Sequence, residues 1–248
     1  MRLHVRTAGE GNGKVAVLLH GITSSSGSWI RVMPELAARG YHVHAVDTLG
    51  HGESPKPNGG YHLDALVAAA AASVPARVDL VIGHSFGGLL AAWGALTGLL
   101  LPRAVVMEDP THWVPSKDYA RKRLRDSEVM PLDLPTFLRD HPDWPEPEAR
   151  ERVLGLQRLS WAGVGACFTE NAPWDIRSRL VELHGRVPVL YVIPEGGDWV
   201  LPGDLPGVRN AIGADRLQVV PGVGHGIHRD NLPEFMRLVD AFTAEAGL

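Results

Sequence analysis

Short apolar runs alternate along the chain with longer stretches in which apolar residues recur at helical spacing. Seven runs are suited to β-strands, and they cover residues 3–8, 14–20, 41–47, 79–83, 103–109, 187–193 and 216–222. From residue 14 onward these runs are almost continuously apolar, which is typical of parallel strands covered on both faces. The pattern therefore predicts an α/β fold with a mostly parallel sheet and crossover helices.

Four stretches outside the strands are predicted to be helices of the same core. They cover residues 28–39, 62–73, 85–99 and 231–246. In the last of them, apolar residues recur with a period close to 3.6, which indicates one buried face.

The segment between residues 110 and 186 has a different character. Charged residues become frequent, prolines cluster near residue 145, and helix-like stretches follow one another without a recognisable strand. We expect one domain over residues 1–248, with a core of residues 1–109 and 187–248 and a helical cap insertion at about 110–186.

Composition narrows the classes of partner. A chain of 248 residues with 45% hydrophobic residues can bury a full core, and its net charge of −4 provides no basic field for nucleic acid or anionic membranes. We therefore expect a small-molecule substrate that is neutral or modest in charge. No heptad repeat is present, so a monomer and a homodimer are both compatible with the sequence.

Cysteine usage and the N-terminus suggest a reducing compartment. Cys167 is the single cysteine, which excludes an internal disulfide and a thiolate metal site, and no metal is expected. The first residues lack the apolar stretch of a secretory signal, so a cytoplasmic location is expected. Residues 80–102 carry no charge and are long enough to span a bilayer, but their glycines favour a buried strand, a turn and a helix.

The clearest chemical motif is Gly-His-Ser-Phe-Gly at residues 83–87. It follows a predicted strand and opens an apolar helix, which is the context of a nucleophile elbow. A serine on such a turn projects its hydroxyl above the sheet, and the helix directs its N-terminal amides toward developing negative charge. Ser85 is therefore the predicted nucleophile.

Two further loops supply the other groups that acyl transfer needs. His20-Gly21-Ile22 ends the strand at 14–20, and we expect the backbone amides of Ile22 and Phe86 to form an oxyanion hole. His225 follows the last strand in a glycine-rich loop and is the predicted general base, with His228 as its rival.

The carboxylate that orients the base has two candidates. Asp198 follows the strand at 187–193, and Glu108 lies near the end of the strand at 103–109. Both positions lie at the same sheet edge as Ser85. We favour Asp198 and keep Glu108 as the alternative, whereas Asp109 precedes Pro110 and is interpreted as a turn former.

With these motifs in order, the chain from about residue 3 to residue 242 resembles the α/β-hydrolase superfamily. The matching residues are His20-Gly21, Asp47, Gly50-His51-Gly52-Glu53-Ser54, the elbow at Ser85, Asp198-Trp199 with Pro202, and Gly224-His225. The resemblance implies an eight-stranded, mostly parallel sheet, a helical cap after the sixth strand and no cofactor. In most members the acid follows the seventh strand, as Asp198 does, and in a minority it follows the sixth, which is the position of Glu108.

The predicted function is cleavage of a carboxylic ester or lactone in a small molecule through an acyl-enzyme on Ser85. The resemblance also argues against two activities of the superfamily, since its epoxide hydrolases and haloalkane dehalogenases use an aspartate at the elbow, where this chain has Ser85. Thioesterase, carbon–carbon hydrolase and perhydrolase chemistry stay open. A non-catalytic small-molecule-binding protein on the same scaffold is the alternative from another class.

Overall fold

The computed structural model describes residues 1–197 and 199–248, with the side chains of all of these except residues 126–128. Its strands are β1 (Val5–Ala8), β2 (Lys14–Leu19), β3 (Tyr41–Val46), β4 (Val78–His84), β5 (Pro102–Glu108), β6 (Trp113–Val114), β7 (Trp174–Asp175), β8 (Val189–Pro194) and β9 (Leu217–Val220). Its α-helices are α1 (Val32–Ala38), α2 (Leu63–Ala71), α3 (Phe86–Thr97), α4 (Lys117–Glu128), α5 (Leu134–Asp140), α6 (Glu146–Gln157), α7 (Trp161–Thr169), α8 (Leu180–Arg186), α9 (Leu205–Ile212), α10 (Ile227–Asp230) and α11 (Leu232–Glu245). Four 3-10 helices complete the set: η1 (Ser26–Trp29), η2 (Arg177–Arg179), η3 (Pro202–Asp204) and η4 (Ala214–Arg216).

Over the described residues, the main sheet has seven strands in the order β1-β3-β2-β4-β5-β8-β9. β1 is antiparallel to β3, and every other neighbouring pair is parallel. These strands coincide with the seven apolar runs of the sequence, so the predicted α/β class is confirmed. The resemblance implied eight strands, and this expectation is corrected to seven for the main sheet. The sequence before β2 contains a single apolar run, which forms the antiparallel edge strand β1.

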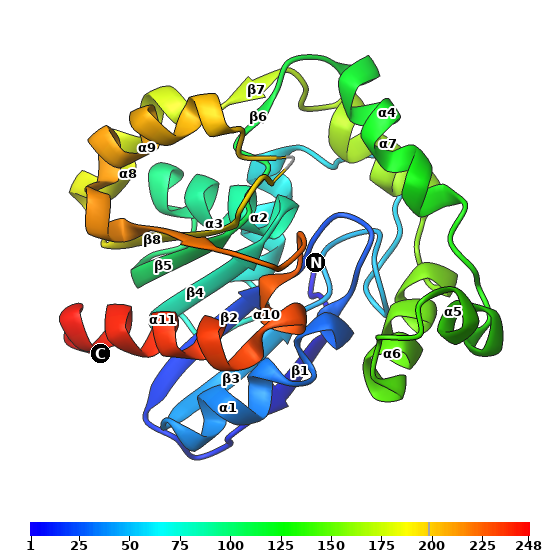
Figure 1. Cartoon of the computed structure of the whole chain (residues 1–248), viewed down its shortest axis with the longest axis horizontal. Helices are drawn as coiled ribbons and strands as arrows, with labels where there is room; N and C mark the ends of the chain where they lie inside the picture. Colours follow the sequence, from blue (N-terminus) through cyan, green and yellow to red (C-terminus); the bar gives the residue numbers. More distant parts are fainter. Residues whose placement is uncertain (198) are drawn as a thin grey trace.

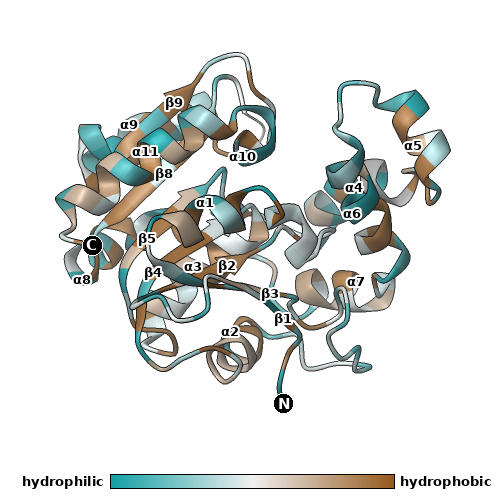
Figure 2. Cartoon of the chain, turned by 90° about the horizontal axis from the view of Figure 1, so that it is seen from below, coloured by the Kyte–Doolittle hydropathy of each residue, from teal (hydrophilic) through white to brown (hydrophobic). Residues whose placement is uncertain are grey.

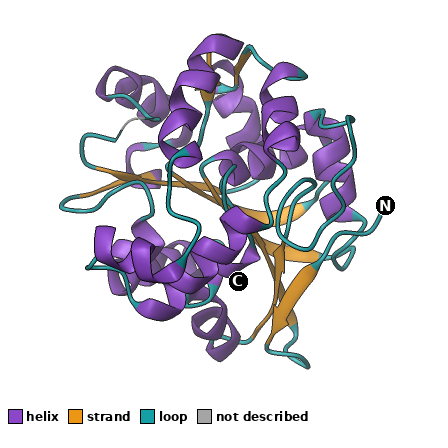
Figure 3. Cartoon of the chain, turned by 90° about the vertical axis from the view of Figure 1, so that its right-hand side faces the viewer, coloured by secondary structure: helices purple, strands orange, loops and turns teal. Residues whose placement is uncertain are grey.

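Helices cover both faces of this sheet (Figure 1), and Figure 3 shows the strands passing between them. Alternate residues of one strand enter different hydrophobic clusters. Val17 and Leu19 of β2 pack in the cluster that includes α2 and α3, whereas Ala16 and Leu18 pack in the cluster that includes α1 and α11. Figure 2 shows the central strands as the apolar layer of the molecule. Burial on both faces explains why the strands have continuously apolar sequences.

The segment between β5 and β8 contains α4, α5, α6 and α7, which Figure 1 shows together on one side of the molecule, apart from α8 and α9. It also contains a feature that the sequence did not reveal. β6 and β7 pair antiparallel through Trp113 and Asp175. Strands of two residues are too short to show an apolar period, so the expectation of a segment without strands is corrected.

The uncharged stretch at residues 80–102 is divided between β4, the turn at Ser85, α3 and the start of β5. None of the helices in the described part of the chain combines the length and apolar character needed to cross a bilayer.

Candidate active site

Ser85 lies on a strained turn between β4 and α3. Its backbone has φ 55° and ψ −118°, a conformation that non-glycine residues rarely adopt and that is typical of a nucleophile elbow. The turn is possible because two neighbours lack side chains. A Cβ atom on Gly83 would lie 2.2 Å from the carbonyl oxygen of Gly87, and one on Gly87 would lie 2.0 Å from that of Leu19. The glycines of the motif are thus required by backbone packing.

The Gly21–Ile22 peptide, which carries the predicted oxyanion amide of Ile22, is held by a buried histidine. The backbone N–H of Thr48 donates to Nε2 of His20 at 3.1 Å, so Nε2 is an acceptor and the proton is on Nδ1. Nδ1 then donates to the Gly21 carbonyl at 2.8 Å. Because C=O and N–H of a trans peptide point in opposite directions, this bond also orients the Ile22 amide.

Burial keeps His20 neutral, since it lowers the pKa of this imidazole to about 4. A neutral ring is needed here, because a protonated Nε2 has no acceptor for the Thr48 amide. The second predicted donor, the amide of Phe86, is in the first residue of α3, directly after Ser85. The structure therefore places the two predicted amides beside Ser85, one in the loop after β2 and one at the start of α3.

The loop at residues 50–54 anchors the same region. Asp47 accepts hydrogen bonds from the backbone of Ser26 at 2.6 Å and of Glu53 at 2.9 Å. His51, which is completely buried, bonds through Nε2 to the carbonyl of Ile22. The loop thus connects β3 to the Ile22 loop and holds it in position, which is a supporting role.

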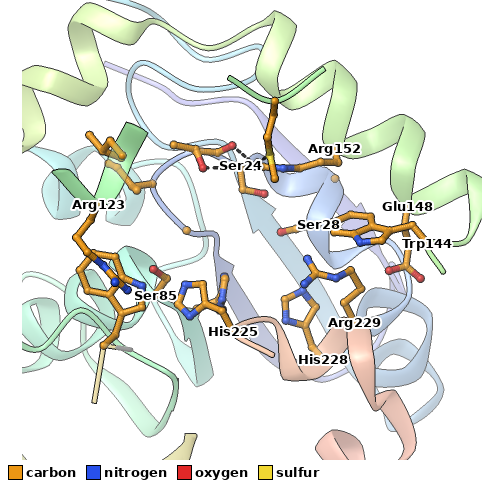
Figure 4. Close-up of a pocket in the computed structure, with 18 of the residues that line it drawn as sticks. Ser24, Ser28, Ser85, Arg123, Trp144, Glu148, Arg152, His225, His228 and Arg229 are labelled. Carbon is orange, nitrogen blue, oxygen red and sulfur yellow. Dashed lines mark hydrogen bonds between the residues drawn. The ribbon is translucent and has the colours of Figure 1, made fainter. Parts of the chain in front are cut away.

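His225 lies between β9 and α10 and pairs with a carboxylate that sequence reasoning did not select. Its Nδ1 is 2.6 Å from Oδ2 of Asp109, which is 1% exposed. A carboxylate on Nδ1 keeps the proton there and leaves Nε2 free to accept a proton from a hydroxyl. Ser85 and His225 both line one cavity, into which Figure 4 shows them pointing.

Asp109 reaches His225 because the chain turns sharply after β5. Its φ is 34°, and its N–H still donates to the carbonyl of Val192 in the neighbouring strand at 2.8 Å. The sequence interpretation of Asp109 as a turn former before Pro110 describes its backbone correctly but misses its side chain. An Asp-Pro pair at a strand end beside the elbow is the signal that could have identified it.

The two carboxylates named from the sequence have different positions. Glu108, which is completely buried, bonds to His228, and its side-chain hydrogen bonds among the described residues do not include His225. Its Oε1 accepts from the backbone N–H of His228 at 2.8 Å, and its Oε2 lies 2.7 Å from Nδ1 of the same residue. Glu108 is the last residue of β5, and this side chain faces α10 rather than the His225 ring. Asp198 lies outside the described residues.

A third histidine completes this cluster. His84, the residue before Ser85, bonds through Nε2 to the backbone carbonyl of His225 at 2.9 Å, and the two ring centroids are 4.5 Å apart. Burial lowers the pKa of His84 well below its usual value, and the neighbouring His225 and His228 add to the effect. His84 is therefore a neutral donor that supports the loop of His225.

The cavity above Ser85 has a volume of about 560 Å³. Its walls come from the Ile22 loop, the His225 loop, α4, α6 and the residues that flank α6. Of the tryptophans near the insertion, Trp144 and Trp199 line this cavity, whereas Trp174 is buried and stacks on Phe168 with ring centroids 5.5 Å apart. Among the described residues, no group of three or more His, Cys, Asp or Glu side chains is arranged to hold a metal ion.

Comparison with known proteins places this site in a family. A pimeloyl-[acyl-carrier protein] methyl ester esterase from Chromobacterium violaceum is 32% identical over 242 residues, covering 86% of this chain and 81% of its own. An enol-lactonase from Burkholderia xenovorans has the same fold at a TM-score of 0.76 and 21% identity, with 98% of this chain and 96% of that chain covered. An esterase from Exiguobacterium antarcticum gives a TM-score of 0.77 at 21% identity, over 97% and 95% of the two chains.

The family model of the alpha/beta hydrolase family matches residues 16–238, which include the elbow, the His225 loop and the whole insertion. The predicted resemblance and fold class are therefore confirmed, and this chain belongs to the alpha/beta hydrolase family.

Proposed function

We propose that this protein is a serine hydrolase that cleaves a carboxylic ester or lactone of a small molecule through an acyl-enzyme on Ser85. The observation that carries the proposal is the pairing of His225 with the buried Asp109 at the rim of the cavity that contains Ser85. Asp109 takes the role for which Asp198 and Glu108 were the sequence candidates. The relatives named as esterases and as a lactonase support this choice of bond.

The first half of the reaction forms the acyl-enzyme. Oγ of Ser85 attacks the substrate carbonyl while Nε2 of His225 takes the hydroxyl proton, and the negative charge on the carbonyl oxygen is stabilised by the amides of Ile22 and Phe86. Asp109 stabilises the imidazolium. His225 then returns its proton to the leaving alkoxide, and the carbon–oxygen bond breaks.

The second half restores the enzyme. Nε2 of His225 takes a proton from water as the water oxygen attacks the acyl carbon, and the proton then moves to Oγ of Ser85 as the acid product leaves. The helices of the insertion contribute to the cavity walls and act in this proposal as a cap, which limits the size of the substrate. Hydrolysis of a lactone follows the same steps, but the leaving alcohol stays attached to the acyl group, so both are part of one product.

Hydrolysis of a panel of p-nitrophenyl esters and lactones tests this function, with Ser85→Ala beside the exposed control Ser178→Ala. We expect turnover by the wild type and the control, labelling of Ser85 by a fluorophosphonate, and loss of both in Ser85→Ala. Thioesters, carbon–carbon substrates and peroxide-dependent oxidation in the same panel test the alternative chemistries. Ligand binding without turnover or labelling would favour the binding-protein alternative instead.

A further inference from the structure

The cavity above Ser85 is lined by more positive than negative side chains, although the chain as a whole is acidic. Its cationic lining residues are Lys122, Arg123, Arg125, Arg152 and Arg229. Among the described lining residues, Glu148 is the single acidic side chain, and its Oε1 is held by Arg31 at 2.9 Å. The described lining residues therefore carry a net positive charge, whereas the chain as a whole has a net charge of −4.

Arg152, on α6, lacks a carboxylate partner among the described residues. Its guanidinium donates to the carbonyl of Thr23, to the hydroxyl of the same residue at 3.4 Å and to the sulfur of Met130 at 3.1 Å. These are neutral acceptors, and a guanidinium has five N–H donors. Burial and the positive charge of Arg229 lower the pKa of Arg152 to about 10, which shows how poorly its charge is compensated. A partly buried cation without a carboxylate partner is expected to gain stability from an anionic ligand.

Arg229 lies on α10, close to the base in the sequence and in space. Its guanidinium packs over the ring of Trp144 at 4.0 Å, and its Nε is 3.2 Å from Asp230. Stacking on an aromatic ring fixes the plane of the guanidinium, as is usual where arginine binds planar anions. In Figure 4, Arg152 and Arg229 lie on one side of His225, and Arg123 lies on the other side.

We propose that the substrate carries a carboxylate in addition to the scissile ester or lactone, and that Arg152 and Arg229 bind this carboxylate while Ser85 attacks the carbonyl. The inference rests on the proposed function and names its substrate class. A carboxylate with one negative charge suits the site better than a phosphate with nearly two, because Glu148 lines the same part of the cavity. One carboxylate stays within the modest substrate charge expected from the sequence.

The test compares two esters of equal chain length, mono-p-nitrophenyl adipate and p-nitrophenyl hexanoate. The adipate ester ends in a carboxylate, whereas the hexanoate ester ends in a methyl group. We expect wild-type kcat/KM to be at least about tenfold higher for the adipate ester, since charge-assisted hydrogen bonds discriminate on this scale. Arg152→Met and Arg229→Met each lower this preference toward equal kcat/KM for the two esters, and added salt weakens it. Arg152→Lys retains part of the preference, which separates loss of charge from misfolding.

The matched control is Arg150→Met on the same helix. Arg150 does not line the cavity and pairs with the exposed Glu146 at 2.7 Å, so its loss leaves the preference unchanged. Equal kcat/KM for the two esters in the wild type, or an unchanged preference in both arginine variants, overturns the carboxylate site while the hydrolase function stands.

Binding to the Ser85→Ala variant separates this inference from the proposed function. Calorimetry with monomethyl adipate, methyl hexanoate and inorganic phosphate is expected to give measurable affinity for the first ligand only, and this affinity is lost when Arg152→Met is added. Such binding supports the carboxylate site even if no ester is hydrolysed. Tighter binding of phosphate than of monomethyl adipate contradicts the assignment of a carboxylate.

Discussion

Replacing Asp109 by asparagine removes the negative charge that faces the imidazole of His225 and keeps the size of the side chain. When His225 is protonated in the transition state, the centres of the two charges are about 4 Å apart, given the 2.6 Å contact between Nδ1 and Oδ2. At an effective dielectric constant of about 20, their attraction is about 4 kcal/mol. Because about 1.4 kcal/mol corresponds to a factor of ten, we expect kcat to fall about a thousandfold.

The assay is the pH-dependent hydrolysis of the best ester of the panel. KM is expected to change little, since the lost interaction forms only when His225 becomes charged. Glu108→Gln and Asp198→Asn are the comparison variants. Each is expected to retain kcat within about tenfold, because Nδ1 of His225 is bonded to Asp109 and Glu108 pairs with a different histidine. Thermal unfolding of each variant verifies that it is folded.

One outcome would refute this reasoning directly. If Asp109→Asn retained most of its activity while Asp198→Asn or Glu108→Gln lost about a thousandfold, the contact between Asp109 and His225 would not orient the catalytic base. The proposed nucleophile would be unaffected by that result, since it rests on the elbow geometry of Ser85.

Three further predictions concern stability and reactivity. Glu108→Gln weakens two buried hydrogen bonds to His228 and is expected to lower the free energy of unfolding in urea by about 3 kcal/mol, whereas the exposed Glu182→Gln changes it by less than about 0.5 kcal/mol. Burial lowers the pKa of His20 to about 4, so below about pH 6.5 the unfolded chain binds a proton that the folded chain does not. This histidine therefore reduces the free energy of unfolding by up to about 3 kcal/mol as the pH falls from 6.5 to 4. His20→Gln should reduce the slope of the free energy of unfolding against pH, and equal slopes in the variant and the wild type would contradict the burial argument. Burial also raises the pKa of the Cys167 thiol, so a thiol-specific disulfide reagent should label it only in guanidinium chloride, and labelling of the native protein would contradict its burial.

The sequence by itself determined the strands of the main sheet and was sufficient to propose Ser85 as the nucleophile. Strands buried on both faces must be continuously apolar, and a serine on a strand-to-helix turn needs glycines two residues away on each side. Both requirements act over a few neighbouring residues, so they can be recognised in one chain without its fold. The same holds for His225, which follows the last strand in a short loop.

Tertiary structure decided which carboxylate faces which histidine. Glu108 and Asp109 are adjacent in sequence, and the left-handed turn at Asp109 sends their side chains to His228 and His225 respectively. The cations of the cavity likewise come from segments far apart in the sequence, with Arg152 on α6 and Arg229 on α10. Their contribution to the site depends on how the insertion packs over the core, which no local pattern of apolar and polar residues encodes.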